Sequence, residues 1–140
     1  AHVLEQLNKG IDLERASRIL DNLRRAGIGA YVYLLFGTPA ETENEALLTL
    51  EFVRAHWRAI TYLNLAIFNM PVCSPEAADL KNRFSDGDLS LYCDFVHPGG
   101  WDRKAVRGFL QKQFRKDALV RKIELRSPGV FGSNHAPFFL

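Results

Sequence analysis

Residues 31–36 are six apolar side chains in a row without a polar break, and they predict a β-strand. Such a run is typical of a strand buried on both faces, as in a parallel sheet covered by helices. A glycine- and proline-containing turn follows at residues 37–40, and Thr42 with Glu45 three residues later has the pattern of a capping box. The stretch predicts a strand, a tight loop and a helix, with any ligand site near the carboxyl end of the strand.

Apolar residues at three- and four-residue spacing predict a helix on each side of this strand. The first helix begins after Asp12 and ends before Gly27. An apolar strand at residues 60–68 follows the second helix, so the order predicts a right-handed βαβ unit. A further short helix is expected within residues 1–8. The predicted apolar faces are Leu13, Ala16, Ile19, Leu20 and Leu23 in the first long helix and Ala46, Leu47, Leu50, Val53 and Trp57 in the second.

The second half of the chain has a mixed pattern. Ser74 and Pro75 predict the start of a short helix that runs to residue 83. Polar and apolar residues alternate at 89–95, which predicts a half-buried edge or antiparallel strand with Cys93 on its apolar side. A helix is expected at 102–116, followed at 117–125 by a second basic helical piece or by its continuation. The apolar tail at 127–140 is expected to be irregular but packed.

Residues 34–46, LLFGTPAETENEA, resemble the fifth-strand region of radical S-adenosylmethionine (SAM) enzymes, where an apolar strand runs into Gly-x-Pro-Gly-Glu-Thr and an acidic helix. The likeness is greatest to the cobalamin-associated and methylthiotransferase-like branches and extends over residues 3–75. Ala40 stands where the family has its second glycine. The resemblance implies an α/β fold: residues 1–75 as a fragment of an incomplete (β/α) TIM-like barrel with parallel strands, and residues 76–140 as a mixed α/β extension packed on it.

The resemblance also implies the chemistry of a radical SAM iron–sulfur oxidoreductase or transferase. In that family a [4Fe–4S] cluster splits SAM to a 5′-deoxyadenosyl radical, and cobalamin is an additional candidate cofactor. The family's CxxxCxxC cluster motif is absent, because Cys73 and Cys93 are the only cysteines. The chain alone is therefore expected to be inactive and to bind neither cluster nor SAM, while it contributes late barrel strands and the adenine side of the SAM site to a longer parent.

Four residues are implied as cofactor-binding, and none is assigned as catalytic or as a metal ligand. Leu35 faces the barrel interior in the resemblance, and Gly37 forms the turn after the strand. Asn69 and Met70 lie at the carboxyl end of the second strand, where the family's backbone contacts adenine. Each has a plainer interpretation: Leu35 as core, which we favour for this chain, and Gly37 as a turn residue. Glu41 is expected to orient a backbone amide or cap the helix.

Positive charge is concentrated in the last third of the chain. The net charge is only +2, but residues 101–126 hold nine Lys and Arg against three Asp and Glu. An alternative function is thus a non-enzymatic binding domain whose basic helical face recognises RNA or an acidic partner. A solvated outer surface is favoured over it, because the interleaved aromatic Phe114 falls on the apolar stripe. The basic residues are Arg103, Lys104, Arg107, Lys112, Arg115, Lys116, Arg121, Lys122 and Arg126.

Partners and compartment follow from the same patterns. Two cysteines in unrelated contexts, with no membrane-spanning run or signal-peptide pattern, favour the cytoplasm. The expected partner is the remainder of the barrel. As a fragment the chain is expected to form a homo-oligomer, because an inward face of Tyr33, Leu35, Leu63 and Leu65 would otherwise be exposed. The alternative is that the apolar tail folds back and plugs this face.

Overall fold

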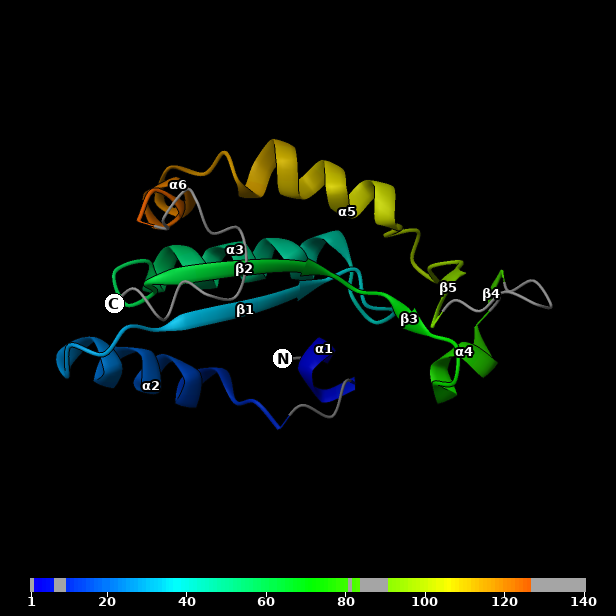
Figure 1. Cartoon of the computed structure of the whole chain (residues 1–140), viewed down its shortest axis with the longest axis horizontal. Coiled ribbons are helices and arrows are strands. Elements are labelled where there is room, and N and C mark those ends of the chain that lie inside the picture. Colours follow the sequence, from blue (N-terminus) through cyan, green and yellow to red (C-terminus); the bar gives the residue numbers. More distant parts are fainter. Residues whose placement is uncertain (1, 7–9, 81, 84–90, 127–140) are drawn as a thin grey trace.

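The computed structural model describes residues 2–6, 10–80, 82–83 and 91–126, and in these residues it has a mixed α/β fold (Figure 1). Helices precede, connect and follow a parallel pair of strands, and a small antiparallel sheet lies beyond one end of that pair. In chain order the elements are α1 (His2–Gln6), α2 (Leu13–Arg25), β1 (Tyr31–Phe36), α3 (Glu43–His56), β2 (Tyr62–Ile67), β3 (Met70–Pro71), α4 (Pro75–Asp79), β4 (Asn82–Arg83), β5 (Tyr92–Phe95), α5 (Arg103–Phe109), the π-helix η1 (Leu110–Phe114) and α6 (Ala118–Glu124).

The parallel pair confirms the predicted strand–helix–strand unit. Strands β1 and β2 run side by side in parallel, in a register that pairs Tyr31 with Tyr62 and Phe36 with Ile67. The capping box that begins α3 is present: the Glu45 carboxylate accepts the Thr42 backbone N–H at 2.7 Å and the Thr42 hydroxyl at 3.0 Å. The described strands form a two-stranded and a three-stranded sheet, and assignment to a barrel stays a prediction.

The two faces of the parallel pair differ: β1 is not buried on both faces as its apolar run predicts, and its exposed side chain lies on the face that was expected to be uncovered in a fragment. The side chains of Val32, Leu34 and Phe36 pack into the main hydrophobic cluster. On the other face, Tyr33 is 58 % exposed. The register pairs Tyr33 with Asn64, and paired residues of parallel strands point to the same side. The even-numbered residues of β2 therefore share Tyr33's face.

Placing Leu63 and Leu65 on the face of Tyr33 was consequently also wrong. Both side chains pack against the main cluster, as does Ile67. Apart from Asn64, β2 is apolar at its odd and its even positions, and its register with β1 decides which of them face the helices. The cluster draws on α2, both parallel strands, α3 and the three C-terminal helices; its buried members are Leu20, Ala30, Phe36, Ala46, Leu50, Val53, Ala59, Ile60, Trp101, Val106, Phe109, Leu110, Phe114, Val120 and Ile123.

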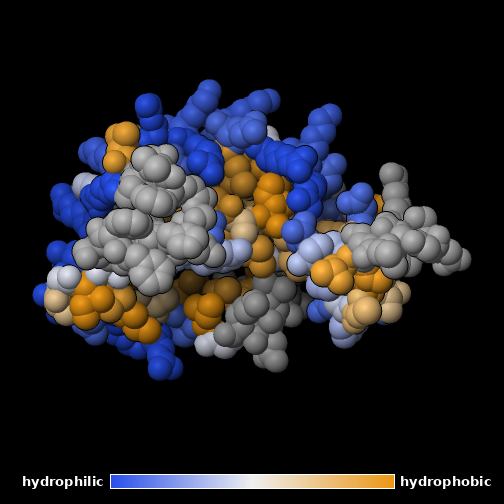
Figure 2. Space-filling model, viewed as in Figure 1, coloured by the Kyte–Doolittle hydropathy of each residue, from blue (hydrophilic) through white to orange (hydrophobic). Residues whose placement is uncertain are grey.

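Helix α2 begins and ends as predicted but buries only part of its apolar face. Asp12 caps it by accepting the Arg15 N–H at 2.6 Å, and Leu20 is buried. Leu13 and Ile19 remain 42 % and 48 % exposed. Figure 2 shows hydrophobic atoms at the surface in this region. In α3, the predicted stripe of Ala46, Leu47, Leu50, Val53 and Trp57 is confirmed as packed in the cluster.

The antiparallel sheet has its own small cluster. Strand β5 lies between β3 and β4 and pairs antiparallel with both. The predicted antiparallel strand is confirmed, and in the described pairing its partners are β3 and β4 rather than β1 or β2. Cys93 is confirmed as a small buried hydrophobe, in contact with Met70 and Ala77. Helix α4 ends at Asp79, earlier than predicted, because Leu80 has an extended backbone.

The C-terminal helices complete the main cluster. Asp102 caps α5 as predicted, accepting the Ala105 N–H at 2.7 Å. The continuous helix predicted to residue 116 changes to a π-helix at Leu110, and Asp117 then caps α6. These helices share a cluster with β1 and β2, whereas the second cluster has members on both sides of residue 75. The division into domains after residue 75 stays a prediction. The tail at 127–140, which was expected to be packed, lies outside the described residues. None of the described helices is long and apolar enough to cross a membrane.

Candidate functional site

A small cavity of about 50 Å³ lies at the carboxyl ends of the parallel strands, where the turn after β1 meets β3 and β5. Gly37, Asn69 and Met70, three of the four predicted cofactor-binding residues, line it. Leu35 does not line it and belongs to neither described cluster; it is half-buried. The remaining lining residues are Ile67, Phe68, Cys93, Asp94, Phe95, Trp101 and Arg103.

Position 37 requires a glycine, because of its backbone conformation and because of the atoms packed around it. Its φ of +79° lies in the left-handed region that side chains rarely adopt. A Cβ atom there would lie 3.2 Å from the Cγ2 atom of Val106 and 3.7 Å from that of Ile67. The turn therefore places the backbone of the loop directly against α5 and the end of β2.

The buried carboxylate of Glu41 links this turn to a distant loop. Its Oε2 accepts the backbone N–H of Gly37 and, at 2.9 Å, the indole N–H of Trp101. The prediction that Glu41 orients a backbone amide is thus confirmed. Burial raises the pKa of Glu41; the two donated hydrogen bonds act against that rise, and the nearby carboxylate of Glu45 adds to it. Glu41 holds the turn in place from within.

His97 forms a second link between the same two segments. Its Nδ1 atom accepts the backbone N–H groups of Gly99 and Trp101, both at 3.1 Å. Because Nδ1 accepts, the proton of the neutral ring is on Nε2, which donates to the Thr38 carbonyl at 2.9 Å. The Thr38 hydroxyl oxygen is itself buried without a hydrogen-bond partner in the described part of the chain. Sequence reasoning found no role for His97 or Trp101, since no spacing connects them to residues 37–41.

The residues after β2 contribute differently to the cavity. Asn69 is exposed, and its Oδ1 accepts from the Arg103 guanidinium at 2.6 Å. Met70 is fully buried, and its side chain belongs to the small cluster, where the Ser74 hydroxyl lies 3.3 Å from Sδ. Met70 could therefore present only its backbone to a ligand, whereas Asn69 forms an accessible rim.

The residues present do not fit an iron–sulfur cluster. Cys93 is in the cavity wall and Cys73 lies in an exposed turn; both are free thiols. Among the described residues no group of three His, Cys, Asp or Glu side chains could hold a metal ion. The cavity is also smaller than the roughly 300–1,000 Å³ of ordinary ligand pockets. As it stands, this end of the sheet could take only one edge of a larger ligand.

A larger hollow of about 400 Å³ lies on the outer surface between α3 and the junction of η1 and α6. An ion pair between Arg54 and Asp117, at 2.8 Å, lies in its wall. Burial acts to raise the pKa of Asp117, but hydrogen bonds from Val120, Arg54 and Leu119 outweigh it and hold that pKa below its ordinary value. None of the predicted site residues lines this hollow, so we take the smaller cavity as the candidate site.

Comparisons with known proteins add no relative: the chain matches no protein-family model, no curated protein and no solved structure.

Proposed function

We propose that this chain contributes late barrel strands and the adenine side of the SAM site to a radical SAM iron–sulfur oxidoreductase or transferase. The observation that carries the proposal is the meeting of Gly37, Asn69 and Met70 around one cavity at the carboxyl ends of two parallel strands. In open α/β sheets, ligands bind at this end of the strands. The resemblance of residues 34–46 supplies the chemical class.

The proposal requires that other parts of the parent protein supply the cluster. With two cysteines in the whole chain, the three-cysteine motif must come from elsewhere. The small volume of the cavity likewise means that most SAM contacts, and any contact with cobalamin, lie outside these residues. This chain's part is to hold the Gly37 turn rigid through Glu41 and Trp101 and to present the backbone at Asn69 and Met70.

The exposed face of the parallel pair supports the proposed partner, the remainder of the barrel. Tyr33, which is 58 % exposed in the middle of β1, is the position that a covering layer from the remainder of the barrel would bury. In its absence we expect a second copy to cover this face, which sedimentation of the isolated chain measures. The free thiols of Cys73 and Cys93 are consistent with the proposed reducing, cytoplasmic setting.

The deciding experiment uses the extended protein. The coding region before Ala1 is sequenced for a CxxxCxxC motif, and the longer protein is reconstituted anaerobically and titrated with SAM by calorimetry. We expect the visible absorbance of a bound cluster and measurable SAM binding. If the motif and SAM binding are both missing, the proposal is wrong.

A pair of matched variants locates the binding. Asn69→Trp places a large ring at the cavity rim, while Asn44→Trp places the same ring at an exposed position of α3. Asn69→Trp should weaken SAM binding by about tenfold or more, equal to about 1.4 kcal/mol, with cluster absorbance unchanged. Equal affinities in the two variants would remove the cavity from the SAM site.

A further inference from the structure

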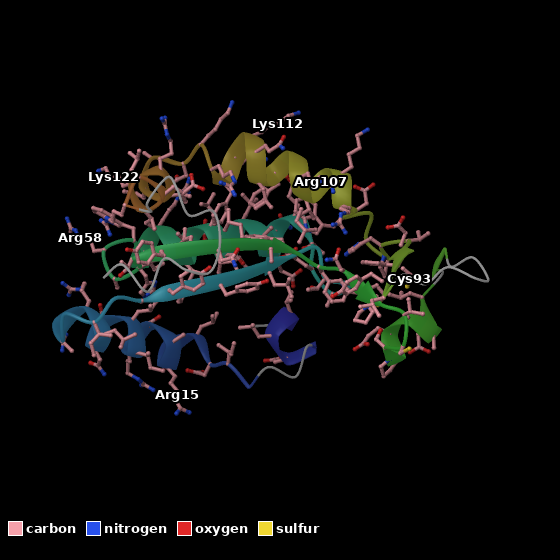
Figure 3. All side chains as sticks on the ribbon, in the orientation of Figure 1. Arg15, Arg58, Cys93, Arg107, Lys112 and Lys122 are labelled. Carbon is pink, nitrogen blue, oxygen red and sulfur yellow. The ribbon has the colours of Figure 1, made fainter. Side chains whose placement is uncertain are left out.

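Three cations surround the indole ring of Trp57 at the opposite end of the parallel strands. The Arg58 guanidinium carbon and the Lys122 Nζ both lie 5.2 Å from the ring centroid, and the Arg126 guanidinium carbon lies 5.3 Å from it. Trp57 and Arg58 follow the last turn of α3, whereas Lys122 comes from α6 and Arg126 from just after it. Figure 3 shows Arg58 and Lys122 at the same end of the molecule, far from Cys93 in the cavity wall.

The charge of this cluster, which we call the Trp57 cation cluster, is not balanced within the described chain. The ion pairs of the described residues use Arg24, Arg54 and Arg115, and none includes a member of the cluster. All three charged groups lie within 5.3 Å of one point, so any two are within twice that distance. That separation is comparable to the Debye length of about 8 Å at physiological ionic strength, so salt screens their repulsion only in part.

The indole ring of Trp57 holds these three cations in place. Cation–π attraction offsets part of their repulsion. The Arg126 guanidinium is also anchored by donating to the Ile60 carbonyl at 3.2 Å. Side chains that are already held lose less entropy when they bind a ligand. Because cations lie around the ring within 5.3 Å, the indole is not free as a platform for a base, which argues for contact with phosphates and against stacking.

We propose that the Trp57 cation cluster binds the phosphodiester backbone of a nucleic acid without reading its sequence. Two of its three cations are arginines, whose planar guanidinium matches two phosphate oxygens. Phosphates of one strand recur about every 3.4 Å along the axis, so a cluster of this span faces two or three of them. This inference is independent of SAM binding at the other end.

Fluorescence anisotropy of a labelled 20-base-pair DNA duplex of mixed sequence tests the proposal on the full 140-residue chain. With three phosphate contacts, the logarithm of the association constant should fall against the logarithm of salt with a slope of about −2.7. Lys122→Gln and Arg58→Gln should each reduce that slope by about 0.9 and weaken binding about tenfold at 50 mM salt. Both side chains are exposed, so the variants should keep the wild-type melting midpoint.

The controls are Arg15→Gln on α2 and Lys112→Gln on η1, which are exposed cations separated from the cluster in Figure 3. Both should bind as the wild type does. The proposal is overturned if the duplex does not bind at 50 mM salt, or if a control weakens binding as much as Lys122→Gln. Displacement of the duplex by poly-glutamate at an equal concentration of charge would also overturn it and assign the cluster to an acidic protein.

Discussion

The chain's two tryptophans lie at opposite ends of the parallel strands and interact with opposite charges. Trp101 is buried, and its indole N–H donates to the carboxylate of Glu41 beside the turn that follows β1. Trp57 is half-buried near the start of β2, and its π-face is surrounded by three cations. At the carboxyl end the charge is enclosed and satisfied by the protein itself, whereas at the amino end it is exposed and unbalanced.

This difference separates two uses of charge. An enclosed carboxylate with two donors fixes the geometry of a loop, and its energetic effect is felt in the stability of the fold. Exposed cations held by a ring contribute little to stability and remain available to a partner. Stability measurements should therefore distinguish the two ends even before any ligand is identified.

The largest expected effect is the contrast between Trp101→Ala and Trp57→Ala. Removing Trp101 empties part of the main cluster, where its ring packs on Phe109 at 5.7 Å between centroids, and leaves Glu41 with one donor fewer. We expect a loss of about 3–5 kcal/mol in the free energy of unfolding. Trp57→Ala at a half-exposed site should cost about 1–2 kcal/mol. Urea unfolding measures both.

Trp101→Phe refines this contrast, because it keeps a ring but removes the N–H donor. Its cost should be about 1–3 kcal/mol, the penalty for a buried acceptor that loses a partner. If Trp57→Ala proves as destabilising as Trp101→Ala, then the charge at the carboxyl end of the parallel strands does not stabilise the fold more than the charge at the amino end, and the comparison is wrong.

A smaller effect is expected at Thr42, which follows Glu41 and begins α3. Thr42→Ala removes the hydroxyl that Glu45 accepts and half of the capping box, at a cost of about 1 kcal/mol. Glu43→Ala is the matched control, an exposed residue of the same helical turn for which the described hydrogen bonds include no cap. Thermal melting should place Thr42→Ala below Glu43→Ala. Equal midpoints would contradict a helix start that depends on this box.

The smallest expected effect is a pH dependence of opposite sign at two carboxylates. The pKa of Glu41 is raised above its ordinary 4.5, so the stability that it contributes falls as pH rises from 4.5 through the folded-state pKa. The pKa of Asp117 is lowered below 3.8, so its contribution is present above 3.8 and is lost as pH falls through the folded-state pKa.

Urea midpoints of the wild type, Glu41→Gln and Asp117→Asn between pH 3 and 8 (a range of about five units around the ordinary values) measure this. The wild type should lose stability relative to Glu41→Gln as the pH rises above 4.5. Relative to Asp117→Asn it should lose stability as the pH falls below 3.8. Curves that run parallel for all three proteins would show that neither pKa differs between the folded and unfolded chain.

Local patterns predicted the elements well, because their causes lie within a few residues. The apolar run of β1, the Thr42–Glu45 capping box and the Asp12, Ser74 and Asp102 caps are each decided over spans of three to six residues, and each is present. Long-range pairing was not predictable in this way. The face of β2 depends on its register with β1, and the two partners of β5, β3 and β4, are strands of only two residues each.

The candidate site likewise combines residues that their sequence position predicts with long-range contacts that it does not predict. Gly37, Asn69 and Met70 were expected at the carboxyl ends of strands by position alone, and they do line one cavity. The bond between Glu41 and Trp101 joins residues sixty positions apart, and no spacing rule anticipates it. The Trp57 cation cluster was missed for the same reason, since Trp57 directly follows α3, whereas Lys122 lies in α6 and Arg126 just after it.

The main hydrophobic cluster has a consequence for the protein's synthesis. Its buried members extend from Leu20 to Ile123, and the ring of Phe36 packs at 5.4 Å on that of Phe114. A ribosome releases the chain from its N-terminus, so the apolar face of β1 and β2 emerges long before α5 and α6 can cover it. At about 5–20 residues per second this interval lasts several seconds, during which the nascent chain exposes the surface that chaperones bind.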